Sequence, residues 1–125
     1  YLRKAIELAP ENTEGMIRIT DFYNRIGKYD ETLRFASDDI TDAQLNWNLA
    51  LAYWKTDDFK KAASHFDAAL SDLKDTTAFL LDLYHFLRES GQLERAVDIA
   101  RKYVKLAPTD VDMQDELEQL EEQGY

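Results

Sequence analysis

The residues of this chain that could carry chemistry favour binding over catalysis. The 125 residues include no cysteine, and the two histidines, His65 and His85, form neither an H-x3-H nor an H-E-x2-H pair. Carboxylates are abundant, but a solvated acidic surface explains them without a paired general acid and base. The sequence also lacks a glycine-rich phosphate loop. We therefore predict no enzymatic activity, no cofactor and no metal site.

The clearest candidate for a binding function is a stripe of large apolar residues between positions 46 and 55. One stripe of this segment has the spacing of a helix face packed in a core and consists of Leu49, Ala50 and Tyr53. A second stripe lies beside it and consists of Trp47, Leu51 and Trp54. A helix hairpin needs only one buried face, so we expect the second stripe to contact a ligand. The alternative is that Trp47 and Trp54 pack against adjacent helices or against a missing part of the parent chain.

The charge of the chain argues against two classes of partner. The formal net charge is −10, from 25 acidic and 15 basic residues. Nucleic acids and anionic membranes both attract basic surfaces, so this charge disfavours them. No apolar run reaches the length of about 18 residues that a transmembrane helix needs. We predict a protein or peptide partner of unknown identity, no nucleic acid, no membrane and a cytoplasmic location.

The elements that must position these residues are helices. Only four Gly and two Pro interrupt the chain, which favours helices with short connections. Breaks at Gly27-Lys28-Tyr29, Asp57-Asp58-Phe59 and Gly91-Gln92-Leu93 recur at intervals of 30 and 34 residues, which indicates an internal repeat. The helices are predicted at residues 1–9, 13–26, 29–38, 43–56, 59–73, 76–90, 93–106 and about 110–122. The chain begins inside the first of them, so we expect it to be a fragment of a longer repeat protein.

These residues resemble the tetratricopeptide repeat, a helix–turn–helix unit of 34 residues with the pattern W-x2-L-G-x2-Y, then A-x3-F, then P. The best match is Leu49 to Tyr53 in a first helix and Ala62-x3-Phe66 in a second. Asn46 departs from the pattern, because the tryptophan is displaced to position 47. The resemblance implies an all-α fold, a right-handed α-solenoid of antiparallel helix hairpins.

A single domain over residues 1–125 would then comprise the tail of a preceding repeat (1–12), repeat 1 (13–42), repeat 2 (43–76), repeat 3 (77–110) and a capping helix (111–125). Repeat 1 is four residues short, so its second helix should be brief. Each hairpin cannot bury its apolar face alone, so neighbouring hairpins should share a core. The predicted core residues are Tyr23, Leu49, Tyr53, Phe66, Leu83 and Ile99, with Ala62 and Ala96 at close helix contacts.

The resemblance also implies which residues contact a ligand. In this family the first helix of each repeat lines a concave groove, and contacts recur at fixed places along these helices. The corresponding positions here are Ile17, Asp21, Arg25, Trp47, Asn48, Leu51, Trp54, Leu81, His85 and Arg88. The centre of such a groove would be apolar and aromatic, while Arg25, Arg88 and His85 would select partners with acidic flanks.

One subtype of the family is disfavoured. Chaperone-binding members hold the C-terminal carboxylate of their partner with a clamp of Lys, Asn and Arg. Only Asn48 matches that set, and the other places hold Ile17, Asp21, Ala78 and Asp82. Two acids where cations are needed would repel a carboxylate.

The function that best fits these patterns is a protein–protein interaction module that captures a peptide or helix segment in its groove. The alternative is a structural spacer or self-association segment of a larger repeat array with no groove ligand. Homo-oligomers could then form through the N-terminal helix face of Tyr1, Ala5 and Leu8. A helical repeat that reads RNA is a third possibility, which the acidic charge disfavours.

Overall fold

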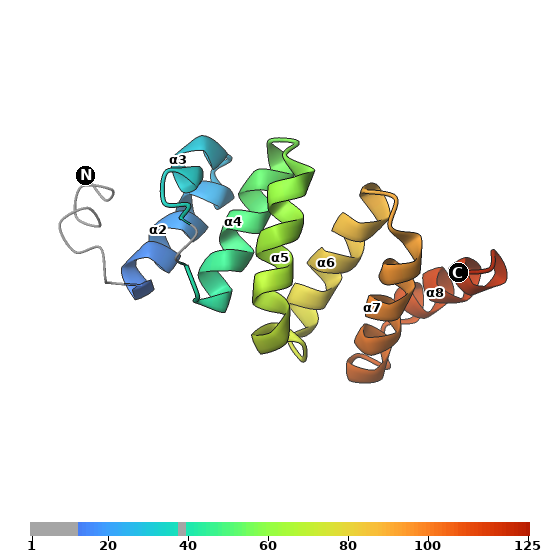
Figure 1. The fold of residues 1–125 in the computed structure, drawn as a ribbon. Coiled ribbons are helices and arrows are strands. Elements are labelled where there is room, and N and C mark those ends of the chain that lie inside the picture. The colour runs from blue at the N-terminus through green and yellow to red at the C-terminus, as the bar shows by residue number, and fades with distance from the viewer. Residues whose placement is uncertain (1–12, 38–39) are drawn as a thin grey trace. The chain divides into compact units, whose positions relative to one another are not determined.

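The computed structural model describes residues 13–37 and 40–125 of the chain. These residues form seven helices and no strand (Figure 1). The helices are α2 (Thr13–Arg25), α3 (Tyr29–Leu33), α4 (Ala43–Lys55), α5 (Phe59–Leu73), α6 (Thr77–Glu89), α7 (Leu93–Leu106) and α8 (Val111–Glu122). The predicted all-α class is confirmed. The helix predicted at residues 1–9, and the oligomer contact predicted on its face, lie outside the described residues.

The helix boundaries agree closely with the predicted ones except in α3. The sequence pattern predicts a helix over 29–38, whereas α3 ends at Leu33. Beyond Leu33 the amides of Arg34, Phe35 and Ala36 donate to carbonyls three residues earlier, at 3.3, 3.1 and 3.1 Å. Such tight turns rarely extend into long helices. Helix α3 is therefore brief, as the four-residue deficit of the predicted repeat 1 led us to expect.

Three hairpin turns share one backbone geometry. Gly27, Asp57 and Gly91 have φ values of +80°, +67° and +81°. In each turn the next residue donates its amide to a carbonyl five residues back, as Lys28 does to Tyr23 at 2.8 Å and Asp58 to Tyr53 at 2.9 Å. This is the Schellman motif at the C-terminus of a helix. It needs one residue in the left-handed backbone conformation, and that residue is usually glycine. Asp57 adopts that conformation at a cost on the order of 1 kcal/mol.

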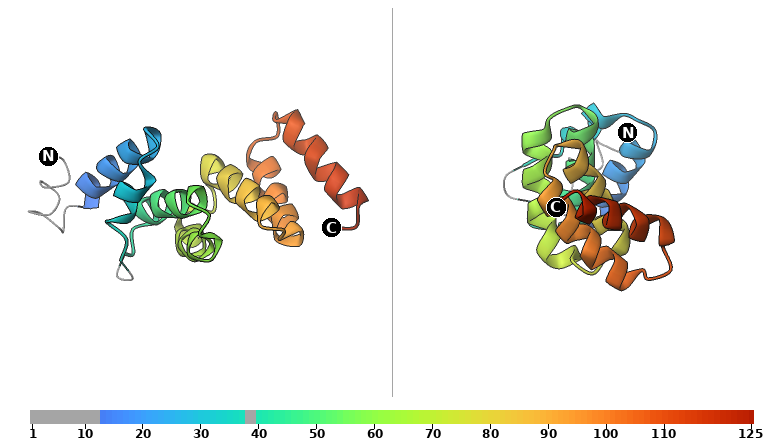
Figure 2. Two further views of the ribbon diagram at one scale, coloured as in Figure 1. Left: turned by 90° about the horizontal axis from the view of Figure 1, so that it is seen from above. Right: turned by 90° about the vertical axis from the view of Figure 1, so that its right-hand side faces the viewer.

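The chain divides into two compact units between Ser71 and Asp72, near the end of α5. In the first unit α2, α3 and α4 pack against one another, and α5 follows α4 across the Asp57 turn (Figure 1). In the second unit α7 packs against both α6 and α8, which are the yellow to red helices of Figure 2. The packed pairs are close neighbours in the sequence, as stacked helix hairpins require.

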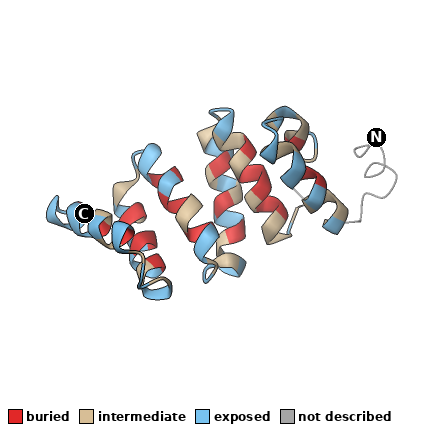
Figure 3. Ribbon diagram, turned by 180° about the vertical axis from the view of Figure 1, so that it is seen from behind, coloured by how far each residue is buried: buried red, intermediate tan, exposed pale blue. Residues whose placement is uncertain are grey.

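Most of the predicted core is buried, as the red segments of Figure 3 show. Leu49, Phe66, Leu83 and Ile99 have exposed fractions of 0, 0, 1 and 6%. The two small residues predicted at close helix contacts, Ala62 and Ala96, are 0% exposed. The alternation of small and aromatic residues therefore predicts the inner faces of these helices correctly.

Tyr23 and Tyr53 are exceptions, because both are only half-buried. The ring of Tyr53 stacks on the ring of His65, with centroids 5.4 Å apart and an interplanar angle of 14°. The ammonium group of Lys61 lies 5.6 Å from the centroid of the Tyr53 ring. Tyr53 therefore lies at the edge of the α4–α5 hairpin, where its ring contacts both an aromatic ring and a charged group.

Aspartates stabilise the first turns of α4 and α8. Asp42 accepts a hydrogen bond from the amide of Leu45 at 2.9 Å, and Asp110 accepts one from the amide of Met113 at 3.1 Å. The hydroxyl of Tyr103, near the end of α7, donates to the second carboxylate oxygen of Asp110 at 2.6 Å. This bond, with that from Met113, holds the pKa of Asp110 below its usual range. The same carboxylate, together with burial, raises the pKa of Tyr103.

We predict that Ala62→Leu lowers the thermal midpoint by several degrees. Ala62 is 0% exposed, so a larger side chain must displace its neighbours, at a cost of about 1–3 kcal/mol. Differential scanning calorimetry measures the shift. Ala68→Leu is the matched control, because Ala68 lies on the same helix and is exposed. An unchanged midpoint for Ala62→Leu would contradict the packing of α5.

We predict that Tyr103→Phe raises the pKa of Asp110 toward that of an ordinary carboxyl group. The lowered folded pKa means that Asp110 stabilises the fold above its unfolded pKa of about 4, and that this stabilisation is lost as the pH falls through the folded pKa. The variant should therefore show a weaker loss of stability than the parent chain below about pH 4. Carboxyl NMR titration measures the pKa, and an identical Asp110 pKa in both chains would refute the assignment.

Candidate functional site

The predicted ligand contacts lie on the first helices of the hairpins. α2 carries Ile17, Asp21 and Arg25, α4 carries Trp47, Asn48, Leu51 and Trp54, and α6 carries Leu81, His85 and Arg88. α2 and α4 pack against each other in the first unit, and α6 belongs to the second unit. The predicted contacts of α2 and α4 therefore lie on two helices that pack together, and those of α6 lie in the second unit.

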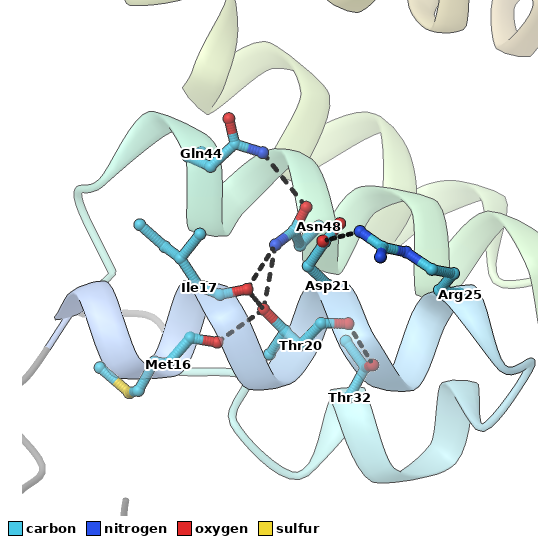
Figure 4. Close-up of polar contacts among 8 residues, drawn as sticks. All are labelled: Met16, Ile17, Thr20, Asp21, Arg25, Thr32, Gln44 and Asn48. Carbon is cyan, nitrogen blue, oxygen red and sulfur yellow. Dashed lines mark hydrogen bonds and ion pairs between the residues drawn. The ribbon is translucent and has the colours of Figure 1, made fainter.

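A buried hydrogen-bond network joins α2 to α4 (Figure 4). The side-chain amide of Asn48 donates to the hydroxyl oxygen of Thr20 at 3.0 Å and to the carbonyl of Ile17 at 3.3 Å. The amide oxygen of Asn48 accepts a hydrogen bond from Gln44 at 3.3 Å. Thr20 donates in turn to the carbonyl of Met16 at 2.7 Å. Both polar ends of the Asn48 side chain are thus satisfied within the chain.

This network corrects the prediction that Asn48 contacts a ligand. Asn48 is 3% exposed and Thr20 is 0% exposed, so neither offers a polar atom to a partner. Asn24 strengthens the same contact by donating its side-chain amide to the main-chain carbonyl of Asn48 at 2.9 Å. Buried amides pay for their desolvation only when hydrogen-bonded, and here that bonding fixes how α2 and α4 pack. We therefore remove Asn48 from the candidate site.

Thr20 is a buried polar residue that the predicted core does not include. It lies on α2, one helical turn after Met16. In the fold its hydroxyl bonds to its own helix and to Asn48, and its carbonyl accepts from the Thr32 hydroxyl at 3.2 Å. The available signal is that Thr20 is three residues before Tyr23 and one after Ile19, on the side of α2 that packs.

The charged residues predicted on α2 pair along the helix. Arg25 lies 2.6 Å from Asp21, with side-chain exposed fractions of 75% and 52%. Arg18 lies 2.5 Å from Glu14 in the same way. Exposed pairs of this spacing contribute only about 0.3–0.5 kcal/mol to stability. They do reduce the positive charge that α2 can offer to an acidic partner.

The apolar residues predicted on α4 are neither sealed in the core nor fully exposed. Trp47, Leu51 and Trp54 are all half-buried. The ring of Trp54 packs edge-on against Phe66 of α5, with centroids 6.3 Å apart and an angle of 66°. The ammonium group of Lys55 lies 5.0 Å from the centroid of the Trp54 ring. Trp54 therefore contributes to packing within the α4–α5 hairpin, as the alternative interpretation of the tryptophans expects.

The residues predicted on α6 have different surroundings. Leu81 is half-buried, whereas His85 and Arg88 are exposed. The ring of His85 lies edge-on to that of Tyr84, with centroids 5.2 Å apart. Arg88 forms an ion pair with Glu116 of α8, and their side chains are 42% and 37% exposed. The guanidinium group predicted to select an acidic partner is thus already paired with a carboxylate of the chain.

Tyr84 is a large buried residue of α6 whose hydroxyl reaches a second helix. Its side chain is 0% exposed, yet its hydroxyl reaches Glu116 and Arg88, each at 3.4 Å. Burial raises the pKa of Tyr84, and the negative charge of Glu116 raises it further. The phenol therefore stays protonated and donates to Glu116, which ties α6 to α8 inside the second unit.

Hollows in the first unit lie away from the predicted contacts. One of about 440 Å³ lies where α2, the end of α3 and the start of α4 come together. Its apolar lining comes from Met16, Phe35, Ile40 and Leu45. Another of about 300 Å³ is lined by Tyr53, Lys61 and His65, among others. None of the ten predicted contact residues lines either hollow.

Residues 13–37 and 40–125 contain no group of three or more histidine, cysteine or acidic side chains that could hold a metal ion. Within the same residues, no helix has the length and apolar character needed to cross a membrane.

Comparison with known proteins identifies relatives of this fold. A family model described as "YpiA-like, C-terminal tetratricopeptide repeats" matches residues 43–110, which is more than half of the chain and includes α4 to α7. One crystal structure of the MamA protein matches with a TM-score of 0.80 and 18% identity, covering 97% of this chain and 68% of that one. A second MamA structure matches with a TM-score of 0.80 and 19% identity, covering 98% and 74%. No curated protein sequence matches the chain.

These comparisons confirm the predicted architecture. At 18% and 19% identity the MamA structures support the fold alone, which is a solenoid of helix hairpins. The matched family span begins at Ala43, the first residue of α4, and ends at Asp110, just before α8.

We predict that Asn48→Ala destabilises the chain by about 1–3 kcal/mol, because it leaves Thr20 and the Ile17 carbonyl without their buried partner. Urea unfolding followed by circular dichroism measures the change. Gln119→Ala is the control, since Gln119 is an exposed amide on α8 and should change stability by less than about 0.5 kcal/mol. Equal stability of Asn48→Ala and the parent chain would refute the structural role of Asn48.

Proposed function

The chain belongs to the tetratricopeptide repeat family, and from this premise we propose that it binds a peptide or helical segment of a partner protein without catalysing a reaction. Repeats of this family generally mediate protein–protein interactions, and their fold is generally non-catalytic. The proposed contacts lie on the first helices of the repeats. In the first unit, α2 and α4 carry Ile17, Asp21, Arg25, Trp47, Leu51 and Trp54, and in the second unit α6 carries Leu81, His85 and Arg88.

The observation that carries this proposal is the apolar surface of α4. Trp47 and Leu51 are half-buried, so part of each side chain remains accessible although the rest of α4 is largely buried. The helix that carries them packs against α2, where the carbonyl of Ile17 accepts a hydrogen bond from Asn48 of α4. Tryptophan in a partly desolvated setting is typical of the residues that dominate protein–protein binding energy.

The ion pairs of the chain bear on the chemistry of the partner. Arg25 pairs with Asp21, and Arg88 pairs with Glu116. An acidic partner would have to compete with these carboxylates and approach a chain of net charge −10. We therefore propose that apolar contacts carry the affinity, and that the arginines do not select acidic flanks.

The alternative function is a spacer or self-association segment with no groove ligand. The packing of Trp54 against Phe66 favours this alternative, because it gives the tryptophan a structural role inside the α4–α5 hairpin. The two functions differ in what Trp47 and Leu51 do: a spacer needs them only for packing, whereas a binding module needs them for affinity.

We predict that Trp47→Ala and Leu51→Ala each weaken peptide binding at least about tenfold. Peptides are first selected against the full chain from a displayed random library. Fluorescence anisotropy then measures the affinity of the best peptide for each folded variant. Tyr29→Ala is the control, because Tyr29 is also half-buried but lies on α3, the second helix of its repeat.

Two outcomes would refute the proposal. If no peptide binds the full chain above the level of a scrambled sequence, the spacer function is favoured. If a selected peptide binds the Trp47→Ala, Leu51→Ala and parent chains equally, the binding face lies elsewhere. Trp54 is left out of this test, because its loss would also disturb the α4–α5 hairpin.

A further inference from the structure

The hollow of about 300 Å³ in the first unit has a lining rich in hydrogen-bond donors. The lining residues are Ala36 and Ser37, which follow α3, Tyr53 of α4, and Lys61, Ser64 and His65 of α5. Of the described residues that line it, none carries a carboxylate and one carries an ammonium group. The serine hydroxyls, the phenol and the imidazole can each donate a hydrogen bond as well. Such a lining suits an anion.

This hollow is separate from the proposed peptide contacts. Those contacts lie on the first helices of the repeats, and none of them lines the hollow, whose donors come mainly from α5 and from the chain after α3. A water molecule in the liquid takes up about 30 Å³, so the hollow has room for a small anion and several waters. The hollow is therefore a second candidate site, and its ligand is independent of the partner of α4.

Lys61 provides the positive charge of the hollow. Its ammonium group lies 5.6 Å from the centroid of the Tyr53 ring, a cation–π contact at the lining. Within the part of the chain that the structure describes, Lys61 forms no ion pair. The carboxylate of Asp58 accepts a hydrogen bond from the main-chain amide of Lys61 at 3.2 Å, which stabilises the first turn of α5. The ammonium group therefore keeps its charge available for a ligand.

Two contacts fix the position of the His65 ring. Its Nδ1 lies 2.8 Å from the amide oxygen of Asn46, which is 2% exposed, and its plane stacks on the ring of Tyr53. Tyr53 thus contacts both His65 and Lys61. Groups that are already ordered lose less conformational freedom when a ligand binds, so this part of the lining is prepared for one.

We propose that this hollow binds an oxyanion of the phosphate class. Lys61 balances the charge of the anion, and the hydroxyls of Ser37 and Ser64 donate hydrogen bonds to its oxygens. A phosphate group carries a charge of about −1.5 to −2 at pH 7 and several strong acceptor oxygens. A carboxylate has only two oxygens, fewer than the donors of the lining. The phosphate group is either a free ion or a phosphorylated side chain of a partner protein.

The acidic character of the chain does not oppose this site at long range. Exposed charges farther away than about 8 Å are largely screened at physiological ionic strength, so the groups near the hollow decide what it binds. Asp38 and Asp39 follow Ser37 in the sequence. Replacing both by asparagine should strengthen phosphate binding, because it removes negative charge close to Ser37 in the chain. Weaker binding by that double variant would overturn the proposal.

Titration of the full chain with sodium phosphate tests the proposal. Sodium chloride keeps the ionic strength constant, and NMR follows the backbone amides of Lys61 and Ser64, which should show saturable shifts while the amides of α8 do not. Lys61→Gln should weaken phosphate binding about tenfold or more, because it removes a charge-assisted hydrogen bond. Lys60→Gln is the matched control, since Lys60 is an exposed lysine of the same helix that is not among the described residues of the lining.

A second pair of probes distinguishes the two sources of phosphate. N-acetyl-O-phosphoserine amide carries the phosphoryl group as it occurs on a protein, and N-acetylserine amide is its control. Tighter binding of the phosphoserine probe than of inorganic phosphate would support a phosphorylated partner. The reverse order would support a free phosphate ion. Binding of N-acetylserine amide with the same affinity as the phosphoserine probe would overturn the proposal.

A variant that keeps the charge of the chain tests the geometry of the hollow. Ser64→Ala should weaken phosphate binding about threefold or more, since it removes one hydroxyl donor. Lys61 and Ser64 are exposed, so both variants should fold, and circular dichroism checks that they do. The absence of saturable shifts in the parent chain would overturn the proposal. Equal losses in Lys60→Gln and Lys61→Gln would also overturn it, because they would show a general attraction between charges in place of a site.

Discussion

Two buried asparagines on α4 determine how the first unit packs. Asn48 bonds to Thr20 and Ile17 of α2, and Asn46, which is 2% exposed, lies 2.8 Å from Nδ1 of His65 on α5. The amide nitrogen of Asn46 donates to the carbonyl of Ile40 at 3.3 Å, and its amide oxygen is the atom that faces Nδ1 of His65. Residues two apart on a helix point in nearly opposite directions. Sliding α4 along either neighbour would leave a buried amide unsatisfied, and the apolar contacts of α4 depend on this fixed register.

The sequence predicts the helix boundaries well because the turns depend on local chemistry. Gly27 and Gly91 mark positions that need a left-handed backbone, and the aspartate at 57 has the same spacing from the helix that follows. The early end of α3 was not predictable in this way. No glycine or proline stands near Leu33, and the tight turns that follow it reflect how little length repeat 1 leaves between α2 and α4.

The candidate site is harder to predict than the fold, because a helical pattern shows which residues share a face but not what each one contacts. Asn48 and Arg88 stand at ligand positions of the repeat, yet both bond to residues 28 positions away in the chain, Thr20 and Glu116. No sequence motif around Thr20 or Glu116 predicts these contacts. The prediction for Tyr53 is wrong for a related reason. Its spacing predicts a core residue, but its ring stacks on His65 at the edge of the α4–α5 hairpin. Trp47 and Leu51 are half-buried, and their contact with a ligand stays a prediction.

The brevity of α3 has a mechanical consequence. Helix α3 has five residues, whereas α5, the second helix of the next hairpin, has 15. When tension is applied to the two ends of a chain, the resistance of each element depends on how many backbone hydrogen bonds and side-chain contacts must break together. Among the described helices, α3 offers the fewest such bonds. Extension under load should therefore begin there and lengthen the connection between α2 and α4 while the α4–α5 and α6–α7 hairpins stay closed. The shortened repeat would act as a compliant joint in a chain of stiffer hairpins.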